Sequence, residues 1–229
     1  MRDDICTIPV SEVFEVRDGC PICRMIKTVE DRVVNYILGD AMMEPDIRIE
    51  TNRLGFCSGH YEKMLHSRGR LQMALMLETH LKSIDENVFA KKMFNSDAKK
   101  AQKTKQLNDS CFICEKTDFG LSNMFETIYR CYESEKEFRE LFNSQPQFCL
   151  PHYERLMSGI TKKSCPHYGG EMAENLSRIT VQHLKKLETD VSKYCSMHDY
   201  RSNKSNADWG DSKTAVERTV AFLSGKWYE

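Results

Sequence analysis

The chain of 229 residues contains no long run of apolar residues. A helix that crosses a bilayer needs about 20 of them, so no membrane-spanning segment is expected. The first residues, Met1-Arg2-Asp3-Asp4, carry two acids, and the apolar stretch of a secretory signal does not follow them. These absences predict a protein of the reducing cytoplasm that has no membrane as its partner.

The chain also lacks an excess of either charge, because 33 Lys and Arg residues face 34 Asp and Glu residues and the formal net charge is −1. Such a balance gives no long-range attraction to nucleic acid or to an anionic surface. Lysines do concentrate in residues 91–110, but Phe94 is the one aromatic residue of that segment. Since sequence-tolerant nucleic-acid binding combines basic with aromatic residues, we expect a solvated linker there, and nucleic acid is a disfavoured partner.

Several motifs of catalysis are missing as well. The sequence has no glycine-rich phosphate loop, no G-x-S-x-G nucleophile turn and no H-E-x-x-H zinc signature. No catalytic residue is therefore assigned, and an enzyme is less favoured than a protein that binds.

What the chain does contain is ten cysteines, six of which belong to two copies of one pattern. The first copy is Cys20-Pro21-Ile22-Cys23 and, after 33 intervening residues, Cys57-Ser58-Gly59-His60. The second copy is Cys111-Phe112-Ile113-Cys114 and, after 34 intervening residues, Cys149-Leu150-Pro151-His152. A single C-x-x-C pair is weak evidence for a metal site, whereas two C-x-x-C…C-x-x-H sets at nearly equal spacing are strong evidence.

Each copy offers three thiols and one imidazole, the complete ligand set of one tetrahedral ion. A C-x-x-C or C-x-x-H pair in the first turn of a helix aims both side chains at one point, and the N-terminus of the helix stabilises thiolates. We therefore predict two zinc ions, one within each copy. The predicted ligands are Cys20, Cys23, Cys57, His60, Cys111, Cys114, Cys149 and His152.

Four protein ligands leave no position for water, so the favoured role of the zinc is structural. An iron–sulfur cluster and reactive thiols or disulfides are the alternatives for the same cysteines. Glu62 and Glu154 are candidates to accept the second ring N–H of a ligand histidine, and Lys63 and Arg155 are candidates to offset the charge of a site. Solvated charges on a helix surface are an equal alternative for these four residues.

The remaining cysteines carry weaker signals. Cys165 and His167, together with Cys195 and His198, would supply the ligands of a third metal site, but they lie outside the duplicated pattern. Cys131 falls near an apolar stripe and is expected in the core.

Apolar residues recur at helical spacing through most of the chain, while the alternation typical of strands is nearly absent. The sequence thus predicts a mainly α protein of duplicated helical modules, each pinned by a Cys3His metal site, with a C-terminal helical tail. Residues 40–56 are expected to form a loop with one short extended piece, because they hold Pro45, several acids and Gly55. The expected organisation is a lead-in at 1–19, repeats at 20–95 and 111–198, a Lys-rich linker at 96–110 and a tail at 199–229.

Motifs along nearly the whole chain resemble those of a bacterial family of unknown function with duplicated C-x-x-C…C-x-x-H patterns. The segments that carry the resemblance are Cys20–Cys23, Met43–Asn52, Gly55–Cys57 with His60, Cys111–Cys114, Phe148–His152, and the ending from Asp199–Arg201 through Trp209-Gly210 to Ser224-Gly225. The resemblance implies a soluble protein of anaerobic, gut-type bacteria. It brings no activity with it, and it draws attention to the Met43–Asn52 segment and the Asp199–Gly210 tail.

Three functions are compatible with these features. The first is a non-enzymatic, zinc-stabilised helical protein that binds a partner protein or a small molecule. The second is a redox or metal-responsive sensor that uses its thiolate clusters. The third is an enzyme with a pocket between the two repeats, for which Asp46, Arg48, Glu50 and Tyr200 are candidate lining residues.

Overall fold

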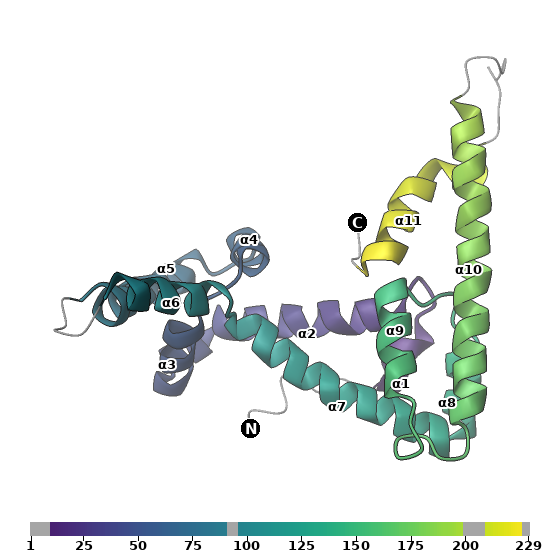
Figure 1. Cartoon of the computed structure of the whole chain (residues 1–229), viewed down its shortest axis with the longest axis horizontal. Helices are drawn as coiled ribbons and strands as arrows, with labels where there is room; N and C mark the ends of the chain where they lie inside the picture. The colour runs from purple at the N-terminus through teal and green to yellow at the C-terminus, as the bar shows by residue number, and fades with distance from the viewer. Residues whose placement is uncertain (1–9, 91–95, 199–208, 226–229) are drawn as a thin grey trace. The chain divides into compact units, whose positions relative to one another are not determined.

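The computed structural model describes residues 10–90, 96–198 and 209–225, and every regular element in these ranges is a helix (Figure 1). The predicted mainly helical fold class is confirmed. No helix within these ranges is long and apolar enough to cross a membrane.

The chain divides into two compact units. Among the described residues, unit 1 comprises 27–90 and 96–122, and unit 2 comprises 10–26, 123–198 and 209–225. Two helices, α2 (Pro21–Ile37) and α7 (Phe112–Ser134), contribute residues to both units. The boundaries of the two units therefore differ from those of the two copies of the cysteine pattern. The repeats at 20–95 and 111–198 remain a prediction from the sequence.

Unit 1 follows the second part of α2 with a series of short helices. They are η1 (Asp40–Met43), α3 (Pro45–Leu54), α4 (Ser58–His66), α5 (Arg70–Ile84), η2 (Asp85–Phe89), α6 (Asp97–Asn108) and the first half of α7. Element η2 is a π-helical turn that continues α5. Its core contains several buried valines and methionines, among them Val33, Met64 and Met76, beside isoleucines, leucines and two phenylalanines.

The expectation of a loop at residues 40–56 is wrong, because α3 occupies most of it. Pro45 does not break this segment. It starts the helix, at a position where its missing N–H is not needed. Ile47, Thr51 and Leu54 form the buried stripe, and α3 packs on α5. Gly55, with a φ of 58°, ends the helix in a conformation that favours glycine.

The Lys-rich segment contains helix α6. The hydroxyl of Ser96 accepts a hydrogen bond from the backbone N–H of Lys99 and caps the first turn. The sequence that follows is rich in Ala, Lys and Gln, which favour helices even where nothing is buried. Indeed α6 has no buried residue.

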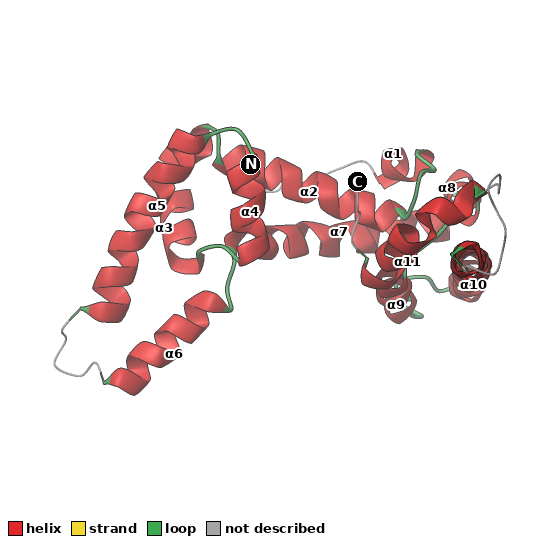
Figure 2. Ribbon diagram, turned by 90° about the horizontal axis from the view of Figure 1, so that it is seen from above, coloured by secondary structure: helices red, strands yellow, loops and turns green. Residues whose placement is uncertain are grey.

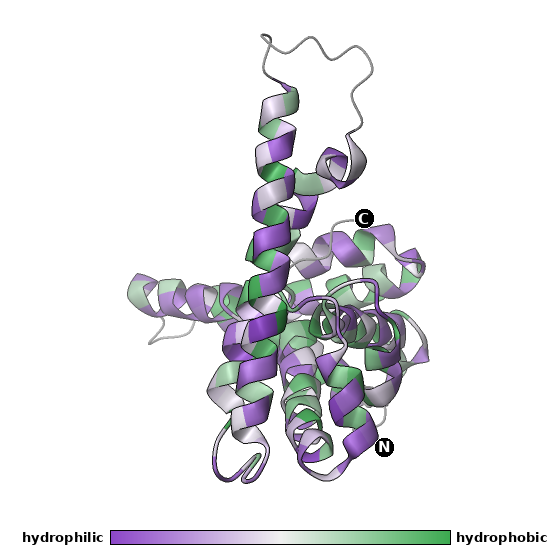
Figure 3. Cartoon of the chain, turned by 90° about the vertical axis from the view of Figure 1, so that its right-hand side faces the viewer, coloured by the Kyte–Doolittle hydropathy of each residue, from purple (hydrophilic) through white to green (hydrophobic). Residues whose placement is uncertain are grey.

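Unit 2 consists of α1 (Val10–Glu15), the start of α2, the end of α7, and five further elements. These are α8 (Lys136–Asn143), α9 (Leu150–Gly159), α10 (Gly169–Met197), η3 (Gly210–Thr214) and α11 (Ala215–Ser224). Its core is aromatic, since the ring of Phe142 contacts those of Phe14, Tyr132 and Phe148 at centroid distances of 5.7, 5.1 and 5.0 Å. Figure 3 shows apolar bands that recur along α10, in keeping with its amphipathic sequence.

Candidate metal centres

Each of the four predicted ligand pairs lies at the start of a helix. Cys20, Cys57, Cys111 and Cys149 directly precede α2, α4, α7 and α9, and in each case the carbonyl of that cysteine accepts the first hydrogen bond of the helix. The second ligand of each pair stands three residues later, in the first turn. Side chains at these two positions point toward one another, as in a capping box. This local geometry explains why two intervening residues separate the ligands of every pair.

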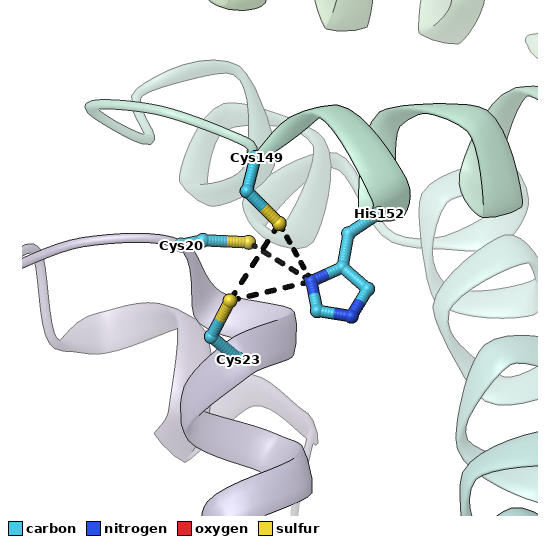
Figure 4. A group of neighbouring side chains, drawn as sticks. All are labelled: Cys20, Cys23, Cys149 and His152. Atoms are coloured by element: carbon cyan, nitrogen blue, oxygen red, sulfur yellow. Dashed lines mark hydrogen bonds between the residues drawn. The ribbon is translucent and has the colours of Figure 1, made fainter. Parts of the chain in front are cut away.

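The first group of ligands, cluster A, consists of Cys20, Cys23, Cys149 and His152 and lies in unit 2 (Figure 4). The Nδ1 atom of His152 is 3.6, 3.3 and 2.9 Å from the sulfurs of Cys20, Cys23 and Cys149. The sulfurs of Cys23 and Cys149 are 3.6 Å apart. All four residues are buried.

The second group, cluster B, consists of Cys57, His60, Cys111 and Cys114 and lies in unit 1. Here the Nδ1 atom of His60 is 3.2, 3.3 and 3.4 Å from the sulfurs of Cys57, Cys111 and Cys114. The sulfurs of Cys57 and Cys114 are 3.9 Å apart. His60 and Cys111 are buried, whereas Cys57 and Cys114 are partly exposed.

The prediction that each copy of the pattern forms its own site is wrong. The C-x-x-C pair of the first copy meets the C-x-x-H pair of the second, and the reverse holds for the other two pairs. The segment between the two ligand pairs of the first copy contains α3, which packs on α5, and Cys57 and His60 form their cluster with the start of α7.

Both clusters have the dimensions of a tetrahedral zinc site. A tetrahedron with Zn–S bonds of about 2.3 Å and Zn–N bonds of about 2.0 Å has S–S edges of about 3.8 Å and S–N edges of about 3.5 Å. The S–S distances of 3.6 and 3.9 Å and most of the S–N distances match these edges. The Cys149–His152 distance of 2.9 Å is the one short edge. The residues thus fit a zinc ion in each cluster, held by four protein ligands.

The thiols of cluster A change one another's pKa. Burial opposes ionisation of Cys20, but hydrogen bonds with Cys149 and Cys23 outweigh it and lower its pKa well below the ordinary value. The hydrogen bond with Cys20 raises the pKa of Cys149 to about 12. One thiolate therefore suppresses ionisation of its neighbours, and a bound dication would remove this conflict by stabilising all three thiolates.

Cluster B shows the same pattern. Burial opposes ionisation of Cys111, but its hydrogen bond with His60 prevails and lowers the pKa to about 6. Burial and the nearby charge of Cys111 raise the pKa of Cys114.

The surroundings of the two clusters differ. The free ring nitrogen of His60, Nε2, is 3.6 Å from a carboxylate oxygen of Glu30, and Lys63 pairs with that carboxylate at 3.0 Å. In cluster A the sulfur of Cys23 is 3.3 Å from the carbonyl oxygen of Gly225, the residue that ends α11. A Cβ atom at Gly225 would lie 3.5 Å from the sulfur of Cys149, at a backbone φ of 68° that favours glycine.

Sequence reasoning missed Glu30 and Gly225. Glu30 stands in the middle of α2, and no fixed spacing relates it to His60, so its role becomes visible only when α2 and α4 are placed together. The residues suggested for this role, Glu62 and Glu154, are exposed. Of the two basic candidates, Lys63 pairs with Glu30 and Asp31, near cluster B, whereas the guanidinium of Arg155 stacks over the ring of Phe125.

The remaining cysteines do not form a third cluster within the part of the chain that the structure describes. Cys165 and His167 both contact the carboxylate of Glu133, which also accepts backbone hydrogen bonds from His167 and Tyr168 at the start of α10. Cys195 is exposed, and Cys131, expected in the core, is half-buried.

The whole chain, residues 1–229, matches the model of a family of unknown function, DUF6062, and the protein belongs to this family. The match confirms the resemblance drawn from the motifs. Comparison with curated proteins gave no match, and comparison with solved structures gave none.

Proposed function

We propose that this protein is a non-enzymatic, zinc-stabilised helical protein that binds a small molecule or a partner protein, with one structural zinc in each unit. The observation that carries the proposal is the presence of two Cys3His groups, each with its four ligand atoms within 4.8 Å of one another. Four protein ligands fill a tetrahedral coordination shell, which is typical of structural rather than catalytic zinc.

The position of the ligands supports a structural role. Each cluster joins two helix starts that are far apart in the sequence, by 126 residues for Cys23 and Cys149 and by 57 for Cys57 and Cys114. Closing such long loops with a metal ion stabilises the folded chain, because the free energy of metal binding becomes free energy of folding. The proposal includes a reducing cytoplasm, where thiols persist, and all nine described cysteines are free.

Elemental mass spectrometry of anaerobically purified protein, with a count of reactive thiols, tests the metal assignment. We expect about two zinc ions per chain and protected ligand thiols. Iron with acid-labile sulfide would replace the zinc assignment with an iron–sulfur protein. A metal-free protein with six reactive thiols would overturn the structural-metal role.

A redox or metal-responsive sensor is the second candidate, and the partial exposure of Cys57 and Cys114 favours it for cluster B. Oxidation of these thiols would release zinc and free the starts of α4 and α7 together. Mild peroxide followed by zinc release and disulfide mapping tests it. Retention of both ions without a new disulfide would exclude the sensor.

An enzyme receives no support from the residues suggested for it. The guanidinium of Arg48 donates hydrogen bonds to the carbonyl oxygens of Met42 and Leu75 and to the hydroxyl of Thr79, and so joins η1, α3 and α5. Glu50 pairs with Lys116 at 3.0 Å. These side chains hold unit 1 together. Tyr200 lies outside the described residues.

A further inference from the structure

Unit 1 contains a cavity of about 730 Å³ whose walls come from α3, α5, η2 and α6. Cavities of about 300–1,000 Å³ are typical of small-molecule sites. One wall includes η2, and π-helical turns of this kind are found frequently at functional sites.

Helix α6 forms one side of this cavity without packing into a core. Figure 2 shows α6 leaning away from α3 and α5, which pack on each other. An isolated helix of 12 residues is marginal in water, and α6 has no buried residue of its own. A molecule that fills the cavity would add apolar contacts to those of Leu107, a half-buried leucine of α6.

The lining has a distinct polarity. Its floor includes the buried side chains of Leu54 and Val88, and Leu107 faces it from α6. The rim carries two cations, Arg53 and Lys103, and none of the described lining residues is acidic. Aliphatic, amide and hydroxyl side chains make up the rest of the described lining, and none of these residues is aromatic. This lining suits an aliphatic chain better than a flat ring.

Both cations are within reach of a ligand. Lys103 donates a hydrogen bond of 2.7 Å to the carbonyl oxygen of Asn87 at the rim, which leaves further N–H donors on its ammonium group. Arg53 has one weak ion pair, with Glu115 at 3.9 Å, and both side chains are more than half exposed. Exposed pairs of this kind contribute little, so an incoming carboxylate competes with Glu115 easily.

Cluster B lies next to the cavity along the chain. The hydroxyl of Ser110, a lining residue, donates a 2.8 Å hydrogen bond to the carbonyl of Leu54, another lining residue. Two residues on, the backbone N–H of Phe112 donates to the carbonyl of Gly55 at 2.9 Å. Cys111 directly follows Ser110, so an ion in cluster B would fix the base of the cavity.

We propose that this cavity binds a small amphiphilic carboxylate, with its anionic group at Arg53 and Lys103 and its aliphatic chain over Leu54, Val88 and Leu107. This assignment rests on the proposed zinc-stabilised binding function and names its ligand class. Charge-assisted hydrogen bonds from Arg53 and Lys103 select a negatively charged ligand. Burial of the ligand's aliphatic chain supplies most of the affinity.

Isothermal titration calorimetry on the zinc-loaded whole chain tests the proposal, with decanoate kept below the concentration at which it forms micelles. We expect one saturable site, with decanol about tenfold weaker, because hydrogen bonds between charged groups are lost, and decyltrimethylammonium not bound. Equal binding of all three probes, or no binding of decanoate, overturns the proposal.

Two matched pairs of variants on α6 locate the site. Lys103→Gln should weaken decanoate binding about tenfold, whereas Lys99→Gln, on the same helix but outside the cavity, should leave it unchanged. Gln106→Trp should fill the mouth of the cavity and abolish binding, whereas Gln102→Trp should not. If Lys99→Gln has the same effect as Lys103→Gln, and Gln102→Trp the same effect as Gln106→Trp, decanoate binds elsewhere and the assignment to this cavity fails.

Zinc content measured on the same samples separates this inference from the proposed function. Protein with two zinc ions that does not bind decanoate refutes the cavity assignment and leaves the structural zinc in place. Protein that binds decanoate without zinc supports the cavity and refutes the metal role. Cys57→Ser should lose decanoate binding, and Cys149→Ser, which affects unit 2, should keep it.

Discussion

The two units hold the same set of ligands, three cysteines and one histidine, in different settings. In unit 2, cluster A is wholly buried beside a core of stacked aromatic rings, and the end of α11 lies against it. In unit 1, two ligands of cluster B are partly exposed, the core is rich in valine and methionine, and a cavity lies beneath a helix that buries nothing.

This difference separates the choice of ion, which depends on the ligands, from the stability of the site, which depends on the packing around it. The residue types and the C-x-x-C and C-x-x-H spacings determine which ion each cluster would bind, and they are the same in the two units. The surrounding packing determines how easily the ion and the adjoining helices are disturbed. Flexible methionines adapt to varied shapes, whereas interlocked rings hold one arrangement. We therefore infer that unit 2 is the rigid part of the molecule and unit 1 the adaptable part.

The largest effect should come from removing two ligands of one cluster. Cys23→Ala with Cys149→Ala removes half of cluster A, so one zinc ion should survive a chelator and unit 2 should unfold, since a structural zinc contributes about 10 kcal/mol or more to folding. Cys23→Ala with Cys57→Ala weakens both clusters, and no ion should survive. Metal analysis after chelation gives the count, and the opposite counts would show that the pairing lies within each copy.

The next largest effect concerns the two cores. Phe142→Leu should destabilise unit 2 by about 1.5–4.5 kcal/mol, because three ring contacts are lost and each contributes about 0.5–1.5 kcal/mol. Met76→Leu, an equally buried site in unit 1, should cost less than about 1.5 kcal/mol. Denaturant unfolding of the zinc-loaded proteins measures both, and equal losses would remove the distinction between a rigid and an adaptable core.

The carboxylate of Glu30, beside the ring of His60, should affect the zinc affinity of cluster B and not that of cluster A. Glu30→Gln removes the charge beside the free ring nitrogen and should lower the zinc affinity of cluster B about 10- to 100-fold. Competition with a chromophoric chelator measures the affinity of each ion. Glu62→Gln, at an exposed position of α4 two residues after His60, is the control and should change nothing; an equal loss there would point to a general electrostatic effect.

Exposure should also decide which ion leaves first. During slow chelation, an alkylating reagent should label Cys57 and Cys114 before Cys20 and Cys23, because the first two thiols are partly exposed and the others are buried. Peptide mass spectrometry over time follows the labelling. Simultaneous labelling of the two clusters would mean that the units open together.

The smallest effect should be local to the start of α10. The carboxylate of Glu133 is partly desolvated, yet hydrogen bonds from His167 and Cys165 outweigh this and lower its pKa to about 2. A lowered pKa means that its contribution to stability is complete above about pH 4.5 and is lost as the pH falls toward 2. Glu133→Gln should therefore speed amide hydrogen exchange at His167 and Tyr168 at neutral pH, whereas Glu135→Gln should not.

Much of the candidate site was predictable because it depends on local geometry. The positions of Cys20, Cys57, Cys111 and Cys149 before helices follow from the ligand spacing and from the apolar stripes that come after each pair. The helical fold class follows from the same periodicity. These features need only a few consecutive residues to be specified.

The pairing of the clusters was not predictable in this way. It depends on which helix starts come together in space, and the spacing within each ligand pair carries no information about that. Pro45 is as compatible with a break in residues 40–56 as with the first turn of a helix, and α3, which packs on α5, shows that it starts a helix. The contact of Glu30 with His60 and that of Gly225 with cluster A are likewise tertiary.

The exchange of ligands between copies has a consequence for how the protein is made. When the first copy of the pattern has been synthesised, four ligands are present but neither cluster is complete. His60 belongs to the same cluster as Cys111, and Cys23 to the same cluster as Cys149. Cluster B can close once Cys114 has been synthesised, and cluster A can close only after the chain has been synthesised as far as His152. Neither copy of the motif can therefore mature alone, and a gene cut at the linker would encode two fragments that must find each other before either can hold its ion.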